Sequence, residues 1–370
     1  MSDQPLKRTP FFDLHVAAGA KLVPFAGFEM PVQYPSGITA EHRAVRQAAG
    51  LFDVSHMGEF EISGKDAVAF TSFVTSNDPA ALAVGQVQYS ALLHESGGIV
   101  DDVLVYRFAD RVMLVVNASN IAKDWAHISR FAGRFDVKLR DISDEVALLA
   151  LQGPQAEAAL QPLCPDVQLA PLGYYRFTEG KVAGVQCIIS RTGYTGEDGF
   201  ELYHAPADAK RLWDALLGRP GVQLAGLGAR DSLRLEVGYA LYGNDIDDTT
   251  TPLEAGLNWI VKLKKDDFVG KAALLEQQQA GLKRKLVGFR LTEKGFPRQH
   301  MPVVIGAAGE TYGEVRSGTV SPMTGEAIGT CYLPIEMTGI GTKFAIDIRG
   351  RLTGAEVVET PFWKHGTRKG

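Results

Sequence analysis

The stretch Ala147-Leu148-Leu149-Ala150-Leu151-Gln152-Gly153-Pro154 decides how the fold is organised. Its first five residues are all apolar and predict a buried β-strand. Gly153-Pro154 then predicts the start of a helix, because proline is tolerated in the first helical turn. Downstream, the pattern predicts further strands near 174–178, 184–190 and 200–204. A helix at 207–217 follows them.

A similar order of elements precedes this stretch. Residues 59–63 alternate like a strand, and 66–75 are predicted as a helix with its apolar side inward. Three strands follow at 87–93, 99–108 and 112–116. A helix is then predicted around Ile121, Trp125 and Ile128, and a short strand at 137–139. The repeated order predicts two related α+β units, although no repeat is visible residue by residue. Further upstream, residues 39–50 predict a helix that is capped by Thr39 and ended by Gly50.

The last part of the chain has a different texture. Residues 275–285, rich in Gln, Lys and Gly, predict a linker. Short β-rich runs then recur about every 10 residues and predict a small barrel or sandwich; they are 286–291, 303–305, 314–317, 329–333, 344–348 and 355–359. The expected class is α+β in three domains, with an all-β barrel-like domain last. The boundaries are 1–140, with the N-terminal ~50 residues free to pack on the second unit, then 141–275 and 285–365.

Composition narrows the class of protein. The net charge of −5 over 370 residues argues against a nucleic-acid partner. Three scattered cysteines fit neither a disulfide framework nor a zinc site and suggest a reducing compartment. No secretory leader pattern and no apolar run of ~20 residues is present, so we expect no membrane partner and a cytoplasmic location. A mitochondrial matrix location would require a transit peptide that has been removed.

Searches for familiar catalytic motifs give negative results. The chain contains no phosphate-binding loop, no HExxH and no GxSxG nucleophile elbow. Gly193, Gly196 and Gly199 are spaced too evenly for a dinucleotide fingerprint, and the eight histidines form no ligand pattern. We therefore expect neither a metal nor a flavin.

Three polar groupings stand out instead. The first is Asp101-Asp102 at the start of the β-rich run 99–106, where alternation places Asp102, Leu104 and Tyr106 on one face. An acid among apolar side chains can acquire a shifted pKa and a catalytic role. The alternative is that both acids simply end a turn.

The second and third groupings lie further along. The stretch 191–201 places three glycines around Tyr194 and puts Glu201 on the opposite strand face from its apolar neighbours. It is either a functional loop or a hairpin with a solvated carboxylate. Arg230 lies where a helix begins and can present a fork to a carboxylate. Alternatively it pairs on the surface with Asp231 or Glu236.

Taken together, seven motifs resemble the T-protein (aminomethyltransferase) family of the glycine cleavage system, in the right order and over essentially the whole chain. They are GLFDVSHMG (50–58), GGIVDD (97–102), LQGP (151–154), RTGYTGE (191–197), ARDSLR (229–234), LYGNDI (241–246) and PLEAGL (252–257). The resemblance implies a three-domain cloverleaf around a central folate pocket. It implies that tetrahydrofolate, as co-substrate, accepts the carbon of an aminomethyl group carried on the lipoyl arm of H protein.

The resemblance also implies roles for individual residues. Asp102 matches the catalytic aspartate, Glu201 the carboxylate that grips the pterin, and Arg230 the arginine of the site. The family's C-terminal arginine or tyrosine has no obvious match in 360–365, where Lys364 is the nearest cation. The pocket walls would include Met57, Tyr89, Leu104, Tyr106, Tyr174 or Tyr175, Tyr194, Asn244 and Trp259.

Two other functions use related folate-binding chains. A non-catalytic repair protein of iron–sulfur cluster assembly would carry a Lys-Gly-Cys signature, which this sequence lacks. The folate-binding part of a dimethylglycine or sarcosine oxidase would need a flavin partner. The acceptor reaction itself distinguishes these possibilities from aminomethyl transfer.

Overall fold

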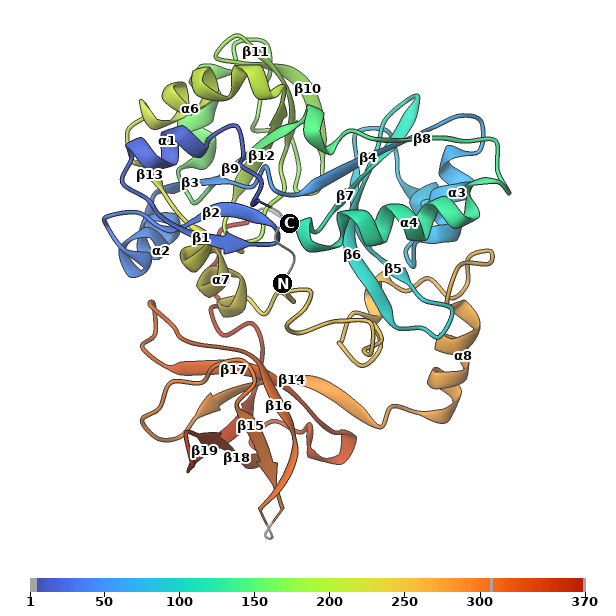
Figure 1. Cartoon of the computed structure of the whole chain (residues 1–370), viewed down its shortest axis with the longest axis vertical. Coiled ribbons are helices and arrows are strands. Elements are labelled where there is room, and N and C mark those ends of the chain that lie inside the picture. The colour runs from blue at the N-terminus through green and yellow to red at the C-terminus, as the bar shows by residue number, and fades with distance from the viewer. Residues whose placement is uncertain (1–4, 307–308, 369–370) are drawn as a thin grey trace.

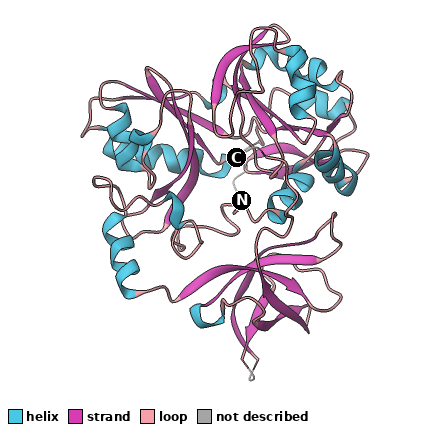
Figure 2. Cartoon of the chain, turned by 180° about the vertical axis from the view of Figure 1, so that it is seen from behind, coloured by secondary structure: helices cyan, strands magenta, loops and turns pink. Residues whose placement is uncertain are grey.

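The computed structural model describes residues 5–306 and 309–368, and Figure 1 shows them as three lobes around a central region. Two lobes combine sheet and helix, and the third consists almost entirely of strands, as the view from behind in Figure 2 makes clear. This confirms the expected α+β class with a C-terminal barrel. The domain boundaries themselves stay a prediction.

The first α+β lobe contains a five-stranded antiparallel sheet in the order β5-β6-β7-β4-β8. Two helices, α3 (Ala67–Val74) and α4 (Ile121–Ala132), bury their apolar sides against it. The strands are β4 (Gly58–Ser63), β5 (Val87–Leu93), β6 (Ile99–Arg107), β7 (Arg111–Val116) and β8 (Lys138–Asp141).

The second lobe contains a six-stranded sheet in the order β10-β11-β12-β9-β3-β13. The order β10-β11-β12-β9 repeats β5-β6-β7-β4 of the first lobe, so the two units are related, as the element order predicts. The elements are β9 (Ala147–Gln152), β10 (Phe177–Val182), β11 (Val185–Ser190), β12 (Gly199–His204) and β13 (Val222–Leu224), with α5 (Ala156–Leu160) and α6 (Ala209–Leu217). The difference between the sheets is β3 (Ala49–Asp53), which inserts between β9 and β13.

The N-terminal segment departs from the prediction in two ways. The helix predicted at 39–50 is α2 (Ile38–Gln47), so Gly37, not Thr39, occupies its N-cap. Gly50 does not end that helix but lies inside β3, because the apolar residues around it complete the second sheet. The sequence pattern also missed α1 (Phe12–Ala17) and the hairpin of β1 (Lys21–Phe25) and β2 (Phe28–Gln33).

The C-terminal lobe is a closed barrel in the order β14-β17-β16-β15-β18-β19. Its strands are β14 (Arg284–Leu291), β15 (Pro302–Ile305), β16 (Glu310–Val320), β17 (Ala327–Pro334), β18 (Lys343–Ile348) and β19 (Arg351–Val358). The predicted linker is wrong in its first half, because α8 (Lys271–Ala280) is helical and buries Leu274 against the first lobe.

The two α+β lobes meet edge to edge. Gln86, next to β5, bridges Arg176, next to β10. The Val87 amide donates to the Tyr175 carbonyl at 2.9 Å, and the Phe177 amide to the Gly85 carbonyl at 2.9 Å. These contacts hold the two sheets in one relative position.

Across residues 5–306 and 309–368, no helix has the length and apolar character that crossing a membrane requires.

Candidate active site

A cavity with a volume of about 1320 Å³ is lined by residues of all three lobes. The first sheet, the second sheet, α7 (Leu227–Glu236) and the barrel strands β14 and β19 all contribute residues to its wall. It is larger than the roughly 300–1,000 Å³ of ordinary small-molecule sites, so it can hold a long ligand or two reactants together.

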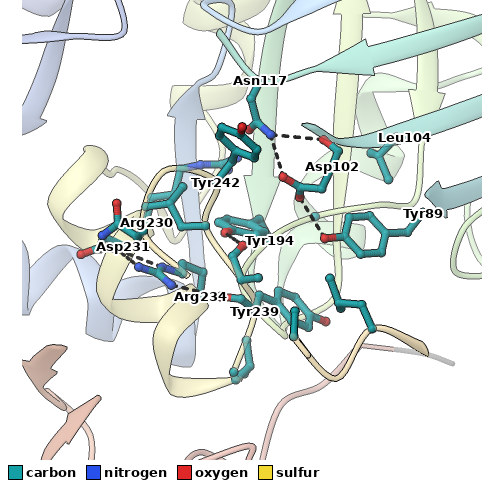
Figure 3. Close-up of a pocket in the computed structure, with 18 of the residues that line it drawn as sticks. Tyr89, Asp102, Leu104, Asn117, Tyr194, Arg230, Asp231, Arg234, Tyr239 and Tyr242 are labelled. Atoms are coloured by element: carbon teal, nitrogen blue, oxygen red, sulfur yellow. Dashed lines mark hydrogen bonds and ion pairs between the residues drawn. The ribbon is translucent and has the colours of Figure 1, made fainter. Parts of the chain in front are cut away.

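Asp102 lies on the wall formed by the first sheet. Strand alternation turns Asp102 and Leu104 toward the cavity, as expected. Tyr89 lies diagonally across on β5, where its hydroxyl donates to Asp102 Oδ2 at 2.9 Å. Asn117, just after β7, donates from Nδ2 to Asp102 Oδ1 at 2.9 Å (Figure 3). Both carboxyl oxygens are therefore held, which excludes the alternative of a simple turn-ending acid.

The surroundings of Asp102 also shift its ionisation. Burial, and then the charge of neighbouring Asp101, raise the pKa of Asp102 to about 7, against the lowering effect of hydrogen bonds from Tyr89 and Asn117. A carboxyl group that titrates near neutral pH can exchange a proton with a substrate under ordinary conditions.

Glu201 lies on the wall formed by the second sheet. Its neighbours Phe200 and Leu202 are buried in the core on the other face of β12, so Glu201 faces the cavity. The Thr192 hydroxyl donates to Oε2. Oε1 accepts no hydrogen bond from the described residues, which leaves it available to a ligand. Burial raises the pKa of Glu201, and Thr192 and Arg230 oppose that shift.

Arg230 enters the cavity from the first turn of α7. Its guanidinium carbon lies 4.8 Å from the centre of the Tyr194 ring. No hydrogen bond or ion pair joins it to another residue within the described part of the chain. Asp231 pairs with Arg234 at 2.7 Å, and Glu236 pairs with Arg46 at 2.9 Å, so the surface pairing of Arg230 with either acid is wrong.

Most of the remaining predicted wall residues do line the cavity. Trp259 is 55% exposed and stacks on Tyr89, with ring centres 5.7 Å apart. The Tyr194 hydroxyl donates to the Ala240 carbonyl, which fixes that ring. The residues of the predicted set found in the wall are Met57, Tyr89, Leu104, Tyr174, Tyr175, Tyr194, Asn244 and Trp259.

Two predicted residues lie elsewhere. Tyr106 shares the strand face of Asp102, but the second sheet covers it there and its hydroxyl bonds to Ser190 at 3.1 Å and to Tyr203 at 2.8 Å. Lys364 is exposed and pairs with Glu359 on the surface. Neither belongs to the cavity wall.

The C-terminal tail supplies a different cation to the cavity. Arg368 lines the wall and donates to the Tyr239 hydroxyl, with its guanidinium 5.8 Å from the centre of the Tyr174 ring. Sequence reasoning missed Arg368, because nothing in the tail shows where it folds back. It also missed Asn117, although a polar residue directly after an apolar strand was an available signal.

The described residues contain no group of three or more His, Cys, Asp or Glu side chains placed to hold a metal ion. Burial keeps one cavity histidine neutral, since the pKa of His56 falls to about 4 through desolvation and the nearby charge of Arg230. Within the described part of the chain, the wall thus combines the Asp102 carboxyl, with a pKa raised to about 7, the Glu201 carboxyl, with one oxygen free of internal bonds, and the Arg230 guanidinium, which pairs with no acid there.

Fold and cavity define a class of three-lobed enzymes in which two related α+β units and a barrel enclose one large site. The GCVT N-terminal domain family matches residues 11–265, and the glycine cleavage T-protein C-terminal barrel domain matches 284–364. The chain thus belongs to the glycine cleavage T-protein family. Family membership makes it an enzyme, a transferase of the glycine cleavage system.

Individual relatives agree over the full length. An aminomethyltransferase of Symbiobacterium thermophilum is 49% identical and covers 99% of this chain and 100% of its own. An aminomethyltransferase of Chloroherpeton thalassium is 52% identical and covers 96% of this chain and 99% of its own. The crystal structure of glycine cleavage system aminomethyltransferase T from Bartonella henselae has a TM-score of 0.93 at 38% identity, covering 98% of this chain and 100% of that one.

Proposed function

We propose that this enzyme transfers the one-carbon unit of the aminomethyl-dihydrolipoyl group on H protein to tetrahydrofolate. The products are 5,10-methylenetetrahydrofolate, ammonia and dihydrolipoyl H protein. The observation that carries the proposal is the meeting of Asp102, Glu201 and Arg230 in one cavity of a T-protein-family chain. We also propose a cytoplasmic location, since the buried cysteines Cys164, Cys187 and Cys331 are all free thiols, as is usual in reducing compartments.

The cavity fits a reduced folate in size and chemistry. An ionised Glu201 can accept two parallel N–H bonds from a pterin edge, and its Oε1 accepts none from the described residues. The guanidinium of Arg230 can bind a carboxylate of the anionic tail, and Arg368 offers a second fork. Tyr89, Tyr175 and Tyr194 supply rings for stacking, worth about 0.5–1.5 kcal/mol per aromatic pair.

Asp102 is the proposed catalytic residue. Tetrahydrofolate, when bound, supplies the amine nitrogens that take up the carbon. Asp102, held from both sides by Tyr89 and Asn117, orients that amine and stabilises positive charge as the carbon arrives. With its pKa near 7, it can also hold the proton that leaves. Because the carbon is already at the oxidation level of formaldehyde, the transfer needs alignment and exclusion of water more than redox chemistry.

The outer part of the cavity suits a carrier-bound arm. Trp259 and Ile340 both line the cavity and are 55% and 74% exposed, so apolar surface is present where the cavity opens to solvent. A lipoyl arm is long and largely apolar, and exposed apolar patches often mark interaction sites. We therefore place the entry of the arm beside these two residues.

The deciding experiment measures ammonia and methylenetetrahydrofolate released from aminomethylated H protein, with and without tetrahydrofolate. Both products should appear together, and only with the folate present. Binding of tetrahydrofolate without release of either product would contradict the proposal. The donor would then have to be sought among flavin-generated imines, as for an oxidase partner.

A further inference from the structure

A second buried acid lies beneath the cavity wall, behind Asp102. Asp101 and Asp124 are both fully buried, Asp101 on β6 and Asp124 in the first turns of α4. Asp101 faces away from the cavity, because successive strand residues point to opposite sides. Neither acid lines the cavity, and the transfer reaction described above uses neither of them.

Three N–H donors hold Asp101 as a carboxylate. The backbone N–H of Asn117 donates to Asp101 Oδ2 at 2.9 Å. The side-chain Nδ2 atoms of Asn117 and Asn120 donate to Asp101 Oδ1 at 2.8 Å and 2.6 Å, respectively. Asn120 is also the N-cap of α4, so the positive end of that helix faces the same carboxylate. Burial is the largest influence and raises the pKa of Asp101, and each of these contacts opposes that rise by favouring the ionised form.

Asp124 has the opposite surroundings. As a carboxylate, neither of its oxygens would find a donor in the described part of the chain. The adjacent cation, Lys123, donates instead to the Tyr242 hydroxyl at 2.6 Å and pairs with Asp248 at 3.5 Å. Burial first, and then the neighbouring carboxyl group of Asp101, raise the pKa of Asp124 to about 11, because two buried carboxylates side by side do not both stay charged. Asp124 therefore carries the proton and donates it to Asp101.

One amide connects this buried pair to the proposed catalytic group. Nδ2 of Asn117 donates both to Asp101 Oδ1 at 2.8 Å and to Asp102 Oδ1 at 2.9 Å. The bond to Asp101 fixes which way the side-chain amide of Asn117 is turned, because a carboxylate oxygen accepts only from its nitrogen. The same nitrogen also donates to the Asp102 backbone carbonyl at 3.2 Å, and Figure 3 shows its bonds to Asp102. A chain of hydrogen bonds thus runs from α4 to the cavity.

We propose that Asp124 is a positioning residue for Asp102: its protonated carboxyl keeps Asp101 ionised, and Asp101 in turn orients the Asn117 amide that binds Asp102. The inference rests on the proposed function for the role of Asp102, but the protonation of Asp124 stands independently of it. The negative charge of Asp101 then has a second effect, because it opposes ionisation of Asp102 next to it.

Several charged and titratable groups surround these acids, and Tyr242 faces both Asp101 and Asp124. Asp102 faces Asp101 on its own strand, Tyr89 on β5, Tyr194 from the loop before β12, and Asp124 from α4. Asp124 additionally faces Lys123, which partly offsets the rise of its pKa to about 11. Among the described residues, Asp101 is the neighbour whose charge raises the pKa of Asp102 most.

Infrared spectroscopy tests the protonation directly and needs no substrate. At about pH 9, above the value for Asp102 and below that for Asp124, the wild-type protein should show a protonated-carboxyl C=O stretch that Asp124→Asn removes. Glu59 is a matched control, because it is also buried with a raised pKa but lies outside the chain of bonds. Glu59→Gln should leave the Asp124 band unchanged. Identical bands in the wild type and Asp124→Asn would overturn the proposal.

The pH profile of the transfer reaction tests the positioning role. Asp124→Ala removes the donor, so Asp101 takes up a proton more readily and the acid limb of kcat/KM should move down by about one pH unit. Asp124→Asn restores a neutral hydrogen-bond donor. The midpoint of the acid limb of kcat/KM should then lie within about 0.3 pH units of the wild-type midpoint. An Asp124→Ala variant that loses activity with an unmoved limb would show a merely structural role and overturn the proposal. Failure of the wild type to release either product would count against the proposed function alone, since the infrared result does not depend on it.

Discussion

The two walls of the cavity differ in how completely their polar groups are bonded within the protein. On the first sheet, Asp102 has both oxygens held, by Tyr89 and by Asn117. On the second sheet and α7, Glu201 has one internal bond, and Arg230 has none among the described residues. The first wall is thus preorganised, as a group that acts on a transition state should be. The second is left open, as a binding surface should be before its ligand arrives.

Asp102→Asn tests the preorganised wall and should have the largest effect. It keeps the shape of the side chain and removes the charge, so kcat should fall about 10²–10³-fold, the usual effect of losing one electrostatic contact to a transition state. Folate affinity should change little, because the charged groups proposed to bind folate, Glu201 and Arg230, lie on the other wall. The measurement is product release from aminomethylated H protein, with tetrahydrofolate binding followed by titration calorimetry. Near wild-type turnover would remove Asp102 from the catalytic role.

Glu201→Gln tests the open wall. A neutral amide accepts pterin N–H bonds less strongly and presents a donor at one position, so the Kd for tetrahydrofolate should rise about 10–100-fold, or roughly 1.5–3 kcal/mol. The matched control is Glu59→Gln, another buried glutamate with a raised pKa outside the cavity. If both variants bound folate equally well, Glu201 would not be a binding residue.

The pH dependence sharpens the contrast between the walls. The pKa of Asp102 is raised to about 7, and its ionised form is the active one in the proposed mechanism. Below that value the proton is bound and the charge is lost, so kcat/KM should fall about tenfold for each pH unit, and it should level off above. Initial rates from about pH 5.5 to 8.5 check this. An acid limb near the ordinary aspartate value of ~3.9 would show that Asp102 is not the titrating group.

The C-terminal tail offers a matched pair of small effects. Arg368→Ala removes a guanidinium from the cavity wall and should raise the Kd for tetrahydrofolate about fivefold, or roughly 1 kcal/mol. Lys364→Ala removes only an exposed ion pair and should leave the Kd unchanged. Folate binding to both variants, measured side by side, decides between the two cations. If Lys364→Ala raised the Kd and Arg368→Ala did not, Lys364 and not Arg368 would be the folate-binding cation.

Much of the architecture could be predicted from local pattern. Alternation in 59–63, 87–93 and 99–108 predicted strands that the structure contains, and the same alternation placed Asp102 and Leu104 on the cavity face. It could not show where along that face the cavity ends. Tyr106 lies two residues further than Leu104, where the second sheet begins to cover the first.

Long-range pairing explains the other misses. The apolar run of β3 reads equally well as the end of a helix, and only its pairing with β9 makes it a strand. Asn117 and Arg368 reach the site from 15 and 266 residues away from Asp102, the second across the whole molecule. No spacing in the sequence encodes such distances.

The sequence by itself determined most element types of the two α+β units, their repeated order, the barrel at the end, and the residue kinds that the site uses. These follow from local propensity and from the period of apolar residues, which act over a few neighbours. Only the tertiary structure decided which of those residues share one cavity, that Asp124 keeps its proton beneath Asp102, and that Arg368 rather than Lys364 faces the site. Those outcomes depend on burial and on contacts between distant segments, and both arise only when the three lobes pack together.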